Sequence, residues 1–273
     1  MVIKTVVVAL VLSFALILLA VMPACANLTL IGAKYEANIT PGQHVENEIK
    51  LNLGAEDLPV DIMTDILGLG QSPNGVYTMI KADQDNGLYT ARPFLNVSPS
   101  NFHLDPGETK TILISGDVPS DIGGGSRYAM ASIRGVSKGS GPVGVSLVLN
   151  VPILLTISDS QISQTAEITE LNADAPVYKN QKNATLTLKN TGNTHYRASV
   201  ESIIKDNEGN IIANSMTTQP NLPPILPDES RKFALQLKSN NTIMPGIYSI
   251  NATAYLEDGT VLASDESQFN VGS

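Results

Sequence analysis

The stretch Leu104-Asp-Pro-Gly-Glu-Thr-Lys-Thr-Ile-Leu-Ile114 recurs in the second half of the chain as Leu226-Pro-Asp-Glu-Ser-Arg-Lys-Phe-Ala-Leu235. When Pro106 is aligned with Pro227, one acidic, one basic and two apolar positions coincide. A tyrosine shortly after a glycine follows the two prolines by 22 and 21 residues, at Tyr128 and Tyr248. A turn signature that leads at the same spacing to a strand start indicates a duplicated domain.

Short runs of alternating apolar residues, separated by Pro, Gly, Asn and Asp, continue from Leu28 to the end of the chain. Alternation with period two places apolar side chains on one face of a strand, and regularly spaced strands are typical of antiparallel sandwiches. The sequence therefore predicts an all-β protein of two tandem Ig-like sandwiches. Strands are expected near 29–39, 45–53, 58–67, 76–81, 93–98, 109–116, 127–136, 143–157, 161–170, 183–190, 195–205, 210–217, 229–238, 247–257 and 261–271.

The stretch 143–157 has an apolar residue at every odd position. We expect one long strand that closes the first sandwich, leaves it near Pro152 and leads into the second. The predicted domains are 27–158 and 159–273. The first is longer between its second strand and the proline signature, so we assign it an insertion at 68–90, which is a natural place either for a specific function or for neutral drift.

Residues 1–26 resemble an export signal. Lys4 precedes an apolar run from Val6 to Met22, and Ala24-Cys25-Ala26 offers a cleavage site before Asn27. The run is long enough for an uncleaved N-terminal anchor, so both outcomes stay open. Either outcome predicts a secreted or extracytoplasmic location at the cell surface, with membrane contact only through this segment.

Cleavage would remove Cys25, the only cysteine, and leave 247 residues (273 minus 26) without a disulfide. That length suffices for two domains with their own cores. The formal net charge of −9 would become −10 on loss of Lys4. An acidic surface argues against nucleic acid as a partner and is otherwise typical of a soluble protein.

Two kinds of modification or ligand site can be proposed from local patterns. Asp83, Asp85 and Asn86 could offer oxygens to calcium, although the spacing matches a calcium loop only in part and a plain Asp-Asn-Gly turn explains it equally. Six Asn-x-Ser/Thr triplets are glycosylation candidates, or chance in a chain rich in these residues. They are at Asn27, Asn38, Asn96, Asn183, Asn240 and Asn251.

Catalytic patterns are missing from the sequence. His44, His103 and His195 lie in different neighbourhoods without zinc-ligand spacing, and Ser126 lacks the Gly-x-Ser-x-Gly elbow. We interpret the histidines as scattered surface or strand residues. The sequence predicts a non-enzymatic protein that has no cofactor unless calcium binds. Tyr128 and Tyr248, each after a glycine at a strand start, are expected to be tyrosine-corner residues.

The chain resembles the WxL-interacting cell-surface proteins, whose domains are PapD-like immunoglobulin sandwiches. In the first domain the resemblance includes Pro41-Gly42, Val97-Ser-Pro99, the proline signature and Gly125-Ser-Arg-Tyr128. In the second it includes Asn190-Thr-Gly-Asn193, Asp206-Asn-Glu-Gly209 and Pro245-Gly-Ile-Tyr248. The resemblance implies binding to a cell-wall polymer or to envelope proteins. The family usually ends in a transmembrane helix and a basic tail, which this sequence does not contain.

The chain also resembles the fimbrial chaperones, which have two Ig-like domains joined through a strand of alternating apolar residues. In that family the strand pairs with an incomplete partner subunit. The alternation over 143–157 is equally what a sandwich strand needs to fill its own core. We therefore expect envelope association or adhesion through strand edges or the 68–90 insertion. The alternative is a periplasmic-type chaperone that binds surface-fibre subunits by β-strand addition.

Overall fold

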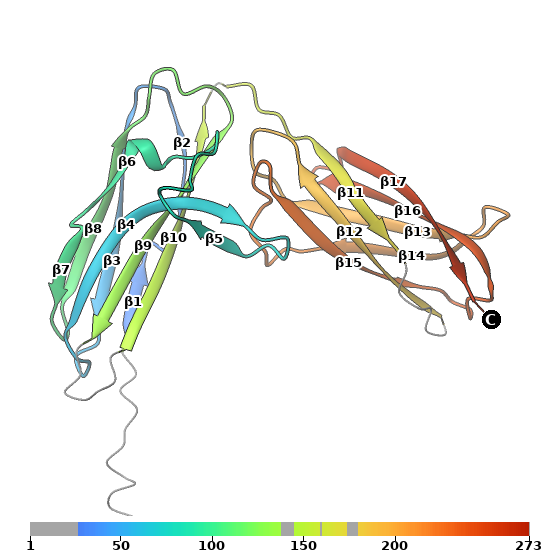
Figure 1. The fold of residues 1–273 in the computed structure, drawn as a ribbon, viewed down its shortest axis with the longest axis horizontal. Coiled ribbons are helices and arrows are strands. Elements are labelled where there is room, and N and C mark those ends of the chain that lie inside the picture. The colour runs from blue at the N-terminus through green and yellow to red at the C-terminus, as the bar shows by residue number, and fades with distance from the viewer. Residues whose placement is uncertain (1–26, 138–144, 159, 174–179, 273) are drawn as a thin grey trace, which may run out of the picture.

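The computed structural model describes residues 27–137, 145–158, 160–173 and 180–272, and its strands form two β-sandwiches. Figure 1 shows the sandwiches set at an angle, with the hairpin of β4 (Val60–Gln71) and β5 (Tyr77–Ile80) reaching from the first toward the second. The predicted export signal, residues 1–26, lies outside the described residues. Within those residues no helix has the length and apolar character needed to cross a bilayer.

The first sandwich consists of two sheets. In the four-stranded sheet the order is β1 (Leu28–Ile31), β3 (His44–Leu53), β8 (Thr109–Asp117) and β6 (Leu95–Ser98). In the six-stranded sheet the order is β2 (Tyr35–Ile39), β10 (Val145–Ile157), β9 (Ser126–Ser137), β4 and β5, and β7 (Asn101–Leu104) also pairs with β4. A short 3-10 turn, Arg92–Phe94, precedes β6.

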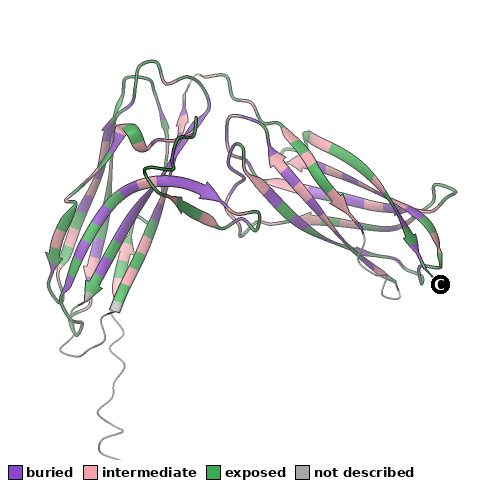
Figure 2. Cartoon of the chain, in the orientation of Figure 1, coloured by how far each residue is buried: buried purple, intermediate pink, exposed green. Residues whose placement is uncertain are grey.

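Alternating side chains fill the core between these sheets, as the purple bands along the strands show in Figure 2. Ile49 and Leu51 of β3, Ile114 of β8 and Ile153 of β10 are fully buried. Each such side chain contributes about 1.5–3 kcal/mol by leaving water. The period-two pattern of the sequence is therefore the pattern of this core, and the all-β prediction is confirmed.

The predicted strand 29–39 is in fact two strands that belong to different sheets. β1 pairs with β3 in one sheet, and β2 pairs in parallel with β10 in the other. Gly32, between them, has φ +90°, and a β-carbon there would lie 3.1 Å from the Glu48 carbonyl oxygen. The chain crosses between the sheets in a left-handed conformation, which glycine adopts readily and other residues adopt rarely. No strand was predicted over β7, Asn101–Leu104.

The second sandwich is formed by one curled sheet. Its strands in order are β11 (Ala166–Asn172), β12 (Gln181–Asn190), β15 (Ser230–Lys238), β14 (Ile211–Thr218), β13 (Ala198–Lys205), β16 (Gly246–Leu256) and β17 (Val261–Val271). β14 and β15 share only the pair Asn214–Lys238, and β11 contacts β17 at the other end of the order. The sheet therefore folds over onto itself and encloses its own core.

The duplicated signature adopts the same backbone in both domains. Gly107 in the first copy has φ +77°, and Asp228, its aligned residue in the second, has φ +64°. Leu104 and Leu226 are both buried, and the aligned apolar pairs that follow are also buried. A non-glycine residue in the left-handed region is uncommon, so a shared positive φ at aligned positions supports duplication of the turn itself.

The two strand-start tyrosines differ. The Tyr248 hydroxyl donates to the Met244 carbonyl oxygen at 2.8 Å, four residues upstream, as a tyrosine corner requires. The Tyr128 hydroxyl instead lies 3.0 Å from Nδ1 of His195, in the second sandwich. The corner expectation is therefore wrong for Tyr128, which contacts the neighbouring domain.

Candidate functional site

Half of strand β10 has a β partner on one side only. It pairs antiparallel with β9 from Val145 to Thr156, whereas β2 covers only Ile153 to Ile157 on the other side. Among the described strands none pairs with the edge from Ser146 to Pro152. At about 3.3 Å per residue this free edge is roughly 20 Å long. The expectation that the strand leaves the sandwich at Pro152 is wrong, since β10 continues to Ile157.

The backbone direction along this edge follows from its two ends. The Ile157 N–H donates to the Gly125 carbonyl oxygen on the β9 side, and the Ser158 N–H donates to the Ile39 carbonyl oxygen on the β2 side. Successive residues of a strand point their N–H and C=O groups to opposite sides, and the β9–β10 register is uninterrupted. Ser146, Val148 and Asn150 therefore direct their N–H and C=O groups to the free edge.

The side chains of the free edge alternate in the same way. Leu147 and Leu149 are half-buried on the core side, where Leu149 and β1 residues Leu28 and Leu30 pack against the first core. Val148 is 47% exposed on the outer side. The edge therefore offers unpaired backbone groups above a row of partly covered apolar side chains.

Gln71, at the end of β4, joins the first sandwich to the second. Its backbone N–H donates to Glu229 Oε1 at 3.0 Å, and its Nε2 donates to the Pro224 carbonyl oxygen at 2.9 Å. Its Oε1 accepts the Leu226 N–H at 3.3 Å. Burial raises the pKa of Glu229, and the Gln71 N–H opposes that rise. The turn that carries the second signature copy is thereby attached to the first domain.

The tip of the β4–β5 hairpin packs on Arg231. The Lys232 N–H donates to the Pro73 carbonyl oxygen at 2.8 Å. The Arg231 guanidinium lies against Gly75, where an added β-carbon would be 2.8 Å from Cζ. Arg231 is buried and donates to the Pro223 carbonyl oxygen at 2.8 Å. The predicted insertion 68–90 is therefore mainly a contact surface between the domains.

His195 has both ring nitrogens directed at the first domain. Nδ1 lies 3.0 Å from the Tyr128 hydroxyl, and Nε2 lies 3.5 Å from Glu36 Oε1 on β2. The neutral ring with its proton on Nε2 satisfies both neighbours, because it accepts from Tyr128 and donates to Glu36. Its side chain is only 13% exposed. The interpretation of His195 as a scattered surface histidine is therefore wrong.

The junction is expected to weaken in mild acid. Burial lowers the pKa of His195 below its ordinary 6.5, with Lys34 and Arg197 lowering it further and Glu36 opposing them. The unfolded chain then binds a proton at higher pH than the folded chain does. The His195 contribution is therefore complete above about pH 6.5 and is lost as the pH falls toward the lower folded value. Urea unfolding at pH 7.5 and 5.0, compared with His195→Gln, measures it.

The comparison with His195→Gln also controls for the contributions of the other two histidines, His44 and His103. Asp117 and Glu46 raise the pKa of His44, and Asp61 raises that of His103, so both act with the opposite sign. The difference between the wild-type chain and His195→Gln cancels them. An NMR titration that places the His195 pKa above 6.5 would contradict the expected sign.

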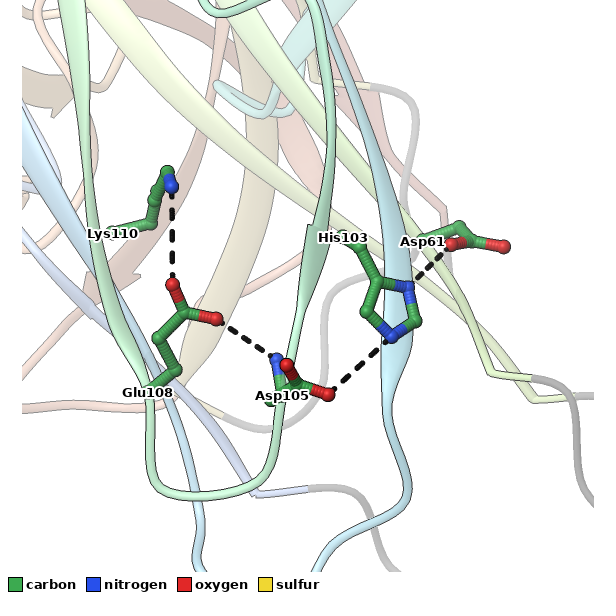
Figure 3. A network of polar contacts seen from close by, with 5 residues as sticks. All are labelled: Asp61, His103, Asp105, Glu108 and Lys110. Atoms are coloured by element: carbon green, nitrogen blue, oxygen red, sulfur yellow. Dashed lines mark hydrogen bonds and ion pairs between the residues drawn. The ribbon is translucent and has the colours of Figure 1, made fainter.

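His103 belongs to an exposed polar network at the other end of the first sandwich (Figure 3). Its Nδ1 lies 2.7 Å from Asp61 and its Nε2 lies 3.6 Å from Asp105. Glu108 accepts the Asp105 N–H at 3.1 Å and lies 3.8 Å from Lys110 Nζ. Because these groups are paired with one another on an open surface, the network stabilises the signature turn and offers no enclosed site.

The three calcium candidates differ in their surroundings. The Asp85 carboxylate is buried and accepts from Thr90 Oγ1 and, at 3.1 Å, from Arg92 Nε. Asp83 and Asn86 are exposed on the same turn. In the described parts of the chain no three His, Cys, Asp or Glu residues are grouped to hold a metal ion. Arg92 supplies the positive charge beside Asp85.

The glycosylation candidates lie on the surface with one partial exception. Asn27, Asn38, Asn96, Asn183 and Asn240 are exposed. Asn251 is half-buried on β16, and its Nδ2 donates to Glu266 Oε2 at 2.7 Å. Glycan attachment stays a prediction for all six, and Asn251 is the least accessible.

A hollow of about 660 Å³ lies on the outer face of the second sandwich, over β13, β14 and β16. Met216 and Tyr255 contribute apolar surface, and the Tyr255 hydroxyl donates to Glu201 at 3.2 Å. Arg197 and Glu257 add charges of opposite sign, so the lining favours no single ligand class.

No protein-family model matches this sequence, and no curated protein is similar to it in sequence. Solved structures with a similar fold include the class 5 fimbriae chaperone CfaA, at 12% identity and a TM-score of 0.45, over 90% of this chain and 100% of that chain. Another is the Salmonella enterica SafA pilin in complex with the SafB chaperone, at 11% and 0.42, over 91% and 99%. The E. coli chaperone DraB matches at 13% and 0.40, over 89% and 98%.

These similarities concern the fold alone, because the identities are below 25% and the TM-scores below 0.5. They are to chaperones with PapD-like, Ig-like domains, and they do not support the resemblance to WxL-interacting proteins specifically.

Proposed function

We propose that this protein binds an extended segment of another protein by β-strand addition along the free edge of β10. The supporting observation is the segment Ser146–Pro152, which pairs with β9 on one side and with no described strand on the other. An added strand gains main-chain hydrogen bonds from such an edge, and alternate side chains give selectivity. Leu147 and Leu149 would meet the inward side chains of the added strand.

The composition of the edge also supports strand addition. Exposed edges are usually protected by charged residues, prolines or bulges, because they otherwise pair with other chains. Ser146-Leu-Val-Leu-Asn-Val-Pro152 contains no charged residue, and its one proline lies at the end where β2 begins. The register with β9 has no bulge along it. The edge is thus open to pairing over most of its length.

The partner that fits this proposal best is a surface-fibre subunit, with the present protein as its chaperone. In one of the similar solved structures, the SafB chaperone is in complex with the SafA pilin. An envelope protein is the second candidate partner, since it too could present an extended segment. A wall polysaccharide has no peptide backbone to pair with the edge. The signal-like residues 1–26 support an activity outside the cytoplasm.

Replacing Val148 by proline is expected to abolish binding and leave the fold intact. The Val148 N–H points to the free edge, so proline removes a donor that only an added strand would use and places its ring in the path of that strand. The test uses residues 27–273 and nine-residue peptides selected from a phage-displayed library. We expect at least a tenfold loss of peptide affinity by calorimetry with Val148→Pro.

Val148→Ala is the matched control, because it keeps the N–H and should bind within about twofold of wild type. Circular dichroism and thermal unfolding check that the proline variant is folded. Independently of any variant, peptide binding should slow hydrogen exchange at Ser146, Val148 and Asn150. Equal affinity for the proline variant, or exchange at these amides unchanged by peptide, would contradict strand addition at this edge.

A further inference from the structure

The outer face of the six-stranded sheet carries exposed apolar side chains beside the free edge. Val148 of β10 is 47% exposed, Val136 of β9 is 43% exposed and Met63 of β4 is 51% exposed. Their alternate neighbours in these strands, such as Ile62 and Ile133, are buried in the core. The three side chains therefore point away from the core on three adjacent strands.

Arg134 lies at the centre of this group. The register pairs it with Val148 on one side and with Met63 on the other, and Val136 is two residues along the same strand. Directly opposed residues in a sheet have Cβ atoms about 4.5–5.5 Å apart, so these side chains are neighbours. We call Val148, Val136, Met63 and Arg134 the outer cluster.

The Arg134 side chain is exposed, and no carboxylate of the described residues lies within ion-pair distance of its guanidinium. Asp61 and Asp65 of β4 are aligned with Val136 and Ser132, so they are diagonal to Arg134 and not opposite it. An unpaired guanidinium bordered by apolar side chains suits the face of an aromatic ring, which combines apolar contact with cation–π attraction.

We propose that the outer cluster selects partner segments that carry an aromatic residue opposite Val148. This inference rests on the proposed strand addition and concerns the partner's outward-facing side chains. A residue opposite Val148 on an added strand points to the same face as Val148. A ring at that position can lie over Val148 and reach the guanidinium of Arg134 on the next strand.

Three kinds of side chain opposite Val148 would make different contacts with the outer cluster. A leucine would contact Val148 and gain nothing from the charge. A glutamate would pair with Arg134 and lose the apolar contact. A phenylalanine uses both, and exposed cation–π contacts are worth about two- to fivefold in affinity. The partner segment expected for this edge is therefore apolar where it faces Leu147 and Leu149, and aromatic at the outward position between them.

The test takes one selected peptide and places Phe, Leu or Glu at the position opposite Val148, assigned by hydrogen exchange and intermolecular NOEs. We expect Phe to bind about two- to fivefold more tightly than Leu, with Glu weakest, and Arg134→Gln to remove the advantage of Phe over Leu. The matched control is Arg197→Gln, an exposed arginine of the second sandwich, which should leave the ranking unchanged.

Three outcomes would overturn the inference. Glutamate could bind most tightly, which would make the outer cluster an acidic-segment site. The three peptides could bind equally, or Arg134→Gln could leave the preference intact. In each case Val148→Pro still reports on strand addition by itself, because it removes the backbone donor. Light scattering that shows dimers of the chain occupying the edge without peptide would also count against it.

Discussion

Asn190→Ala is expected to destabilise the second sandwich by about 3–5 kcal/mol. Asn190 is fully buried at the end of β12, and its Nδ2 donates to the carbonyl oxygens of Thr194 and Ile225 at 2.8 and 2.9 Å. Its Oδ1 accepts the Gly192 N–H at 2.9 Å. Alanine would leave these three backbone groups buried without their partner, and each orphaned group costs about 1–3 kcal/mol.

Urea unfolding measures the loss of stability, and hydrogen exchange is measured at β12 and β15 in addition. Exchange at these two strands reports on the second sandwich alone. Asn183→Ala is the matched control, since Asn183 is an exposed asparagine on the same strand. It should change stability by less than about 0.5 kcal/mol. A loss below 1 kcal/mol for Asn190→Ala would mean that water replaces the missing amide, and that the network is not the main support of this loop.

The effect should extend to the domain junction. The Thr194 carbonyl is held by Asn190, while the Thr194 hydroxyl lies 2.7 Å from Ser126 Oγ in the first sandwich. The next residue, His195, contacts Tyr128 and Glu36. Loss of the amide therefore removes support from the residues that join the domains, and exchange at Ser126 should also increase.

The strands were predictable because their cause is local. Residues such as Ile49 and Leu51 alternate with polar residues, and that pattern alone fixes which side chains face a core. The duplicated proline turn was predictable for the same reason, whereas the shared positive φ of Gly107 and Asp228 became visible only in the structure. Gly32 marks the split between β1 and β2, although one continuous strand was predicted over 29–39.

The free edge was only half predictable. The alternation over 143–157 predicts a long strand, but which strands lie beside it depends on residues more than 100 positions away. β2 covers five residues of β10 because the chain has already crossed to the other sheet before Tyr35. No local pattern gives that length, so the exposed half of β10 became visible only in the structure.

The junction could not be predicted from local pattern. Glu108 and Glu229 are aligned, yet Glu108 accepts the N–H of its own turn and Glu229 accepts the N–H of Gln71. Similarly, Lys110 is only half-buried, whereas its aligned residue Arg231 is buried under Gly75. The copies diverge in role because only the second turn abuts the other domain. Thr194-His195-Tyr196 likewise contains nothing that points to Glu36.

Gly125→Ala is expected to separate the two sandwiches. Gly125 has φ +91°, and a β-carbon there would lie 2.3 Å from the Asn193 carbonyl oxygen, far inside van der Waals contact. That carbonyl accepts the Ser126 N–H at 2.9 Å, which is one of the main-chain bonds between the domains. Either the backbone leaves its left-handed conformation or Asn193 moves away. Small-angle scattering should show a larger radius of gyration, and unfolding should split into two transitions.

Gly123→Ala distinguishes the clash from backbone strain. Gly123 lies in the same loop with φ +71°, so alanine there pays a similar conformational penalty of about 1–2 kcal/mol. Its β-carbon would meet only Arg127, at an ordinary 3.6 Å. Gly123→Ala should therefore lower stability and leave the scattering profile unchanged. If both variants opened the molecule equally, strain in the loop would be the cause. If neither did, the contacts of Gln71 and His195 alone would be sufficient to hold the domains together.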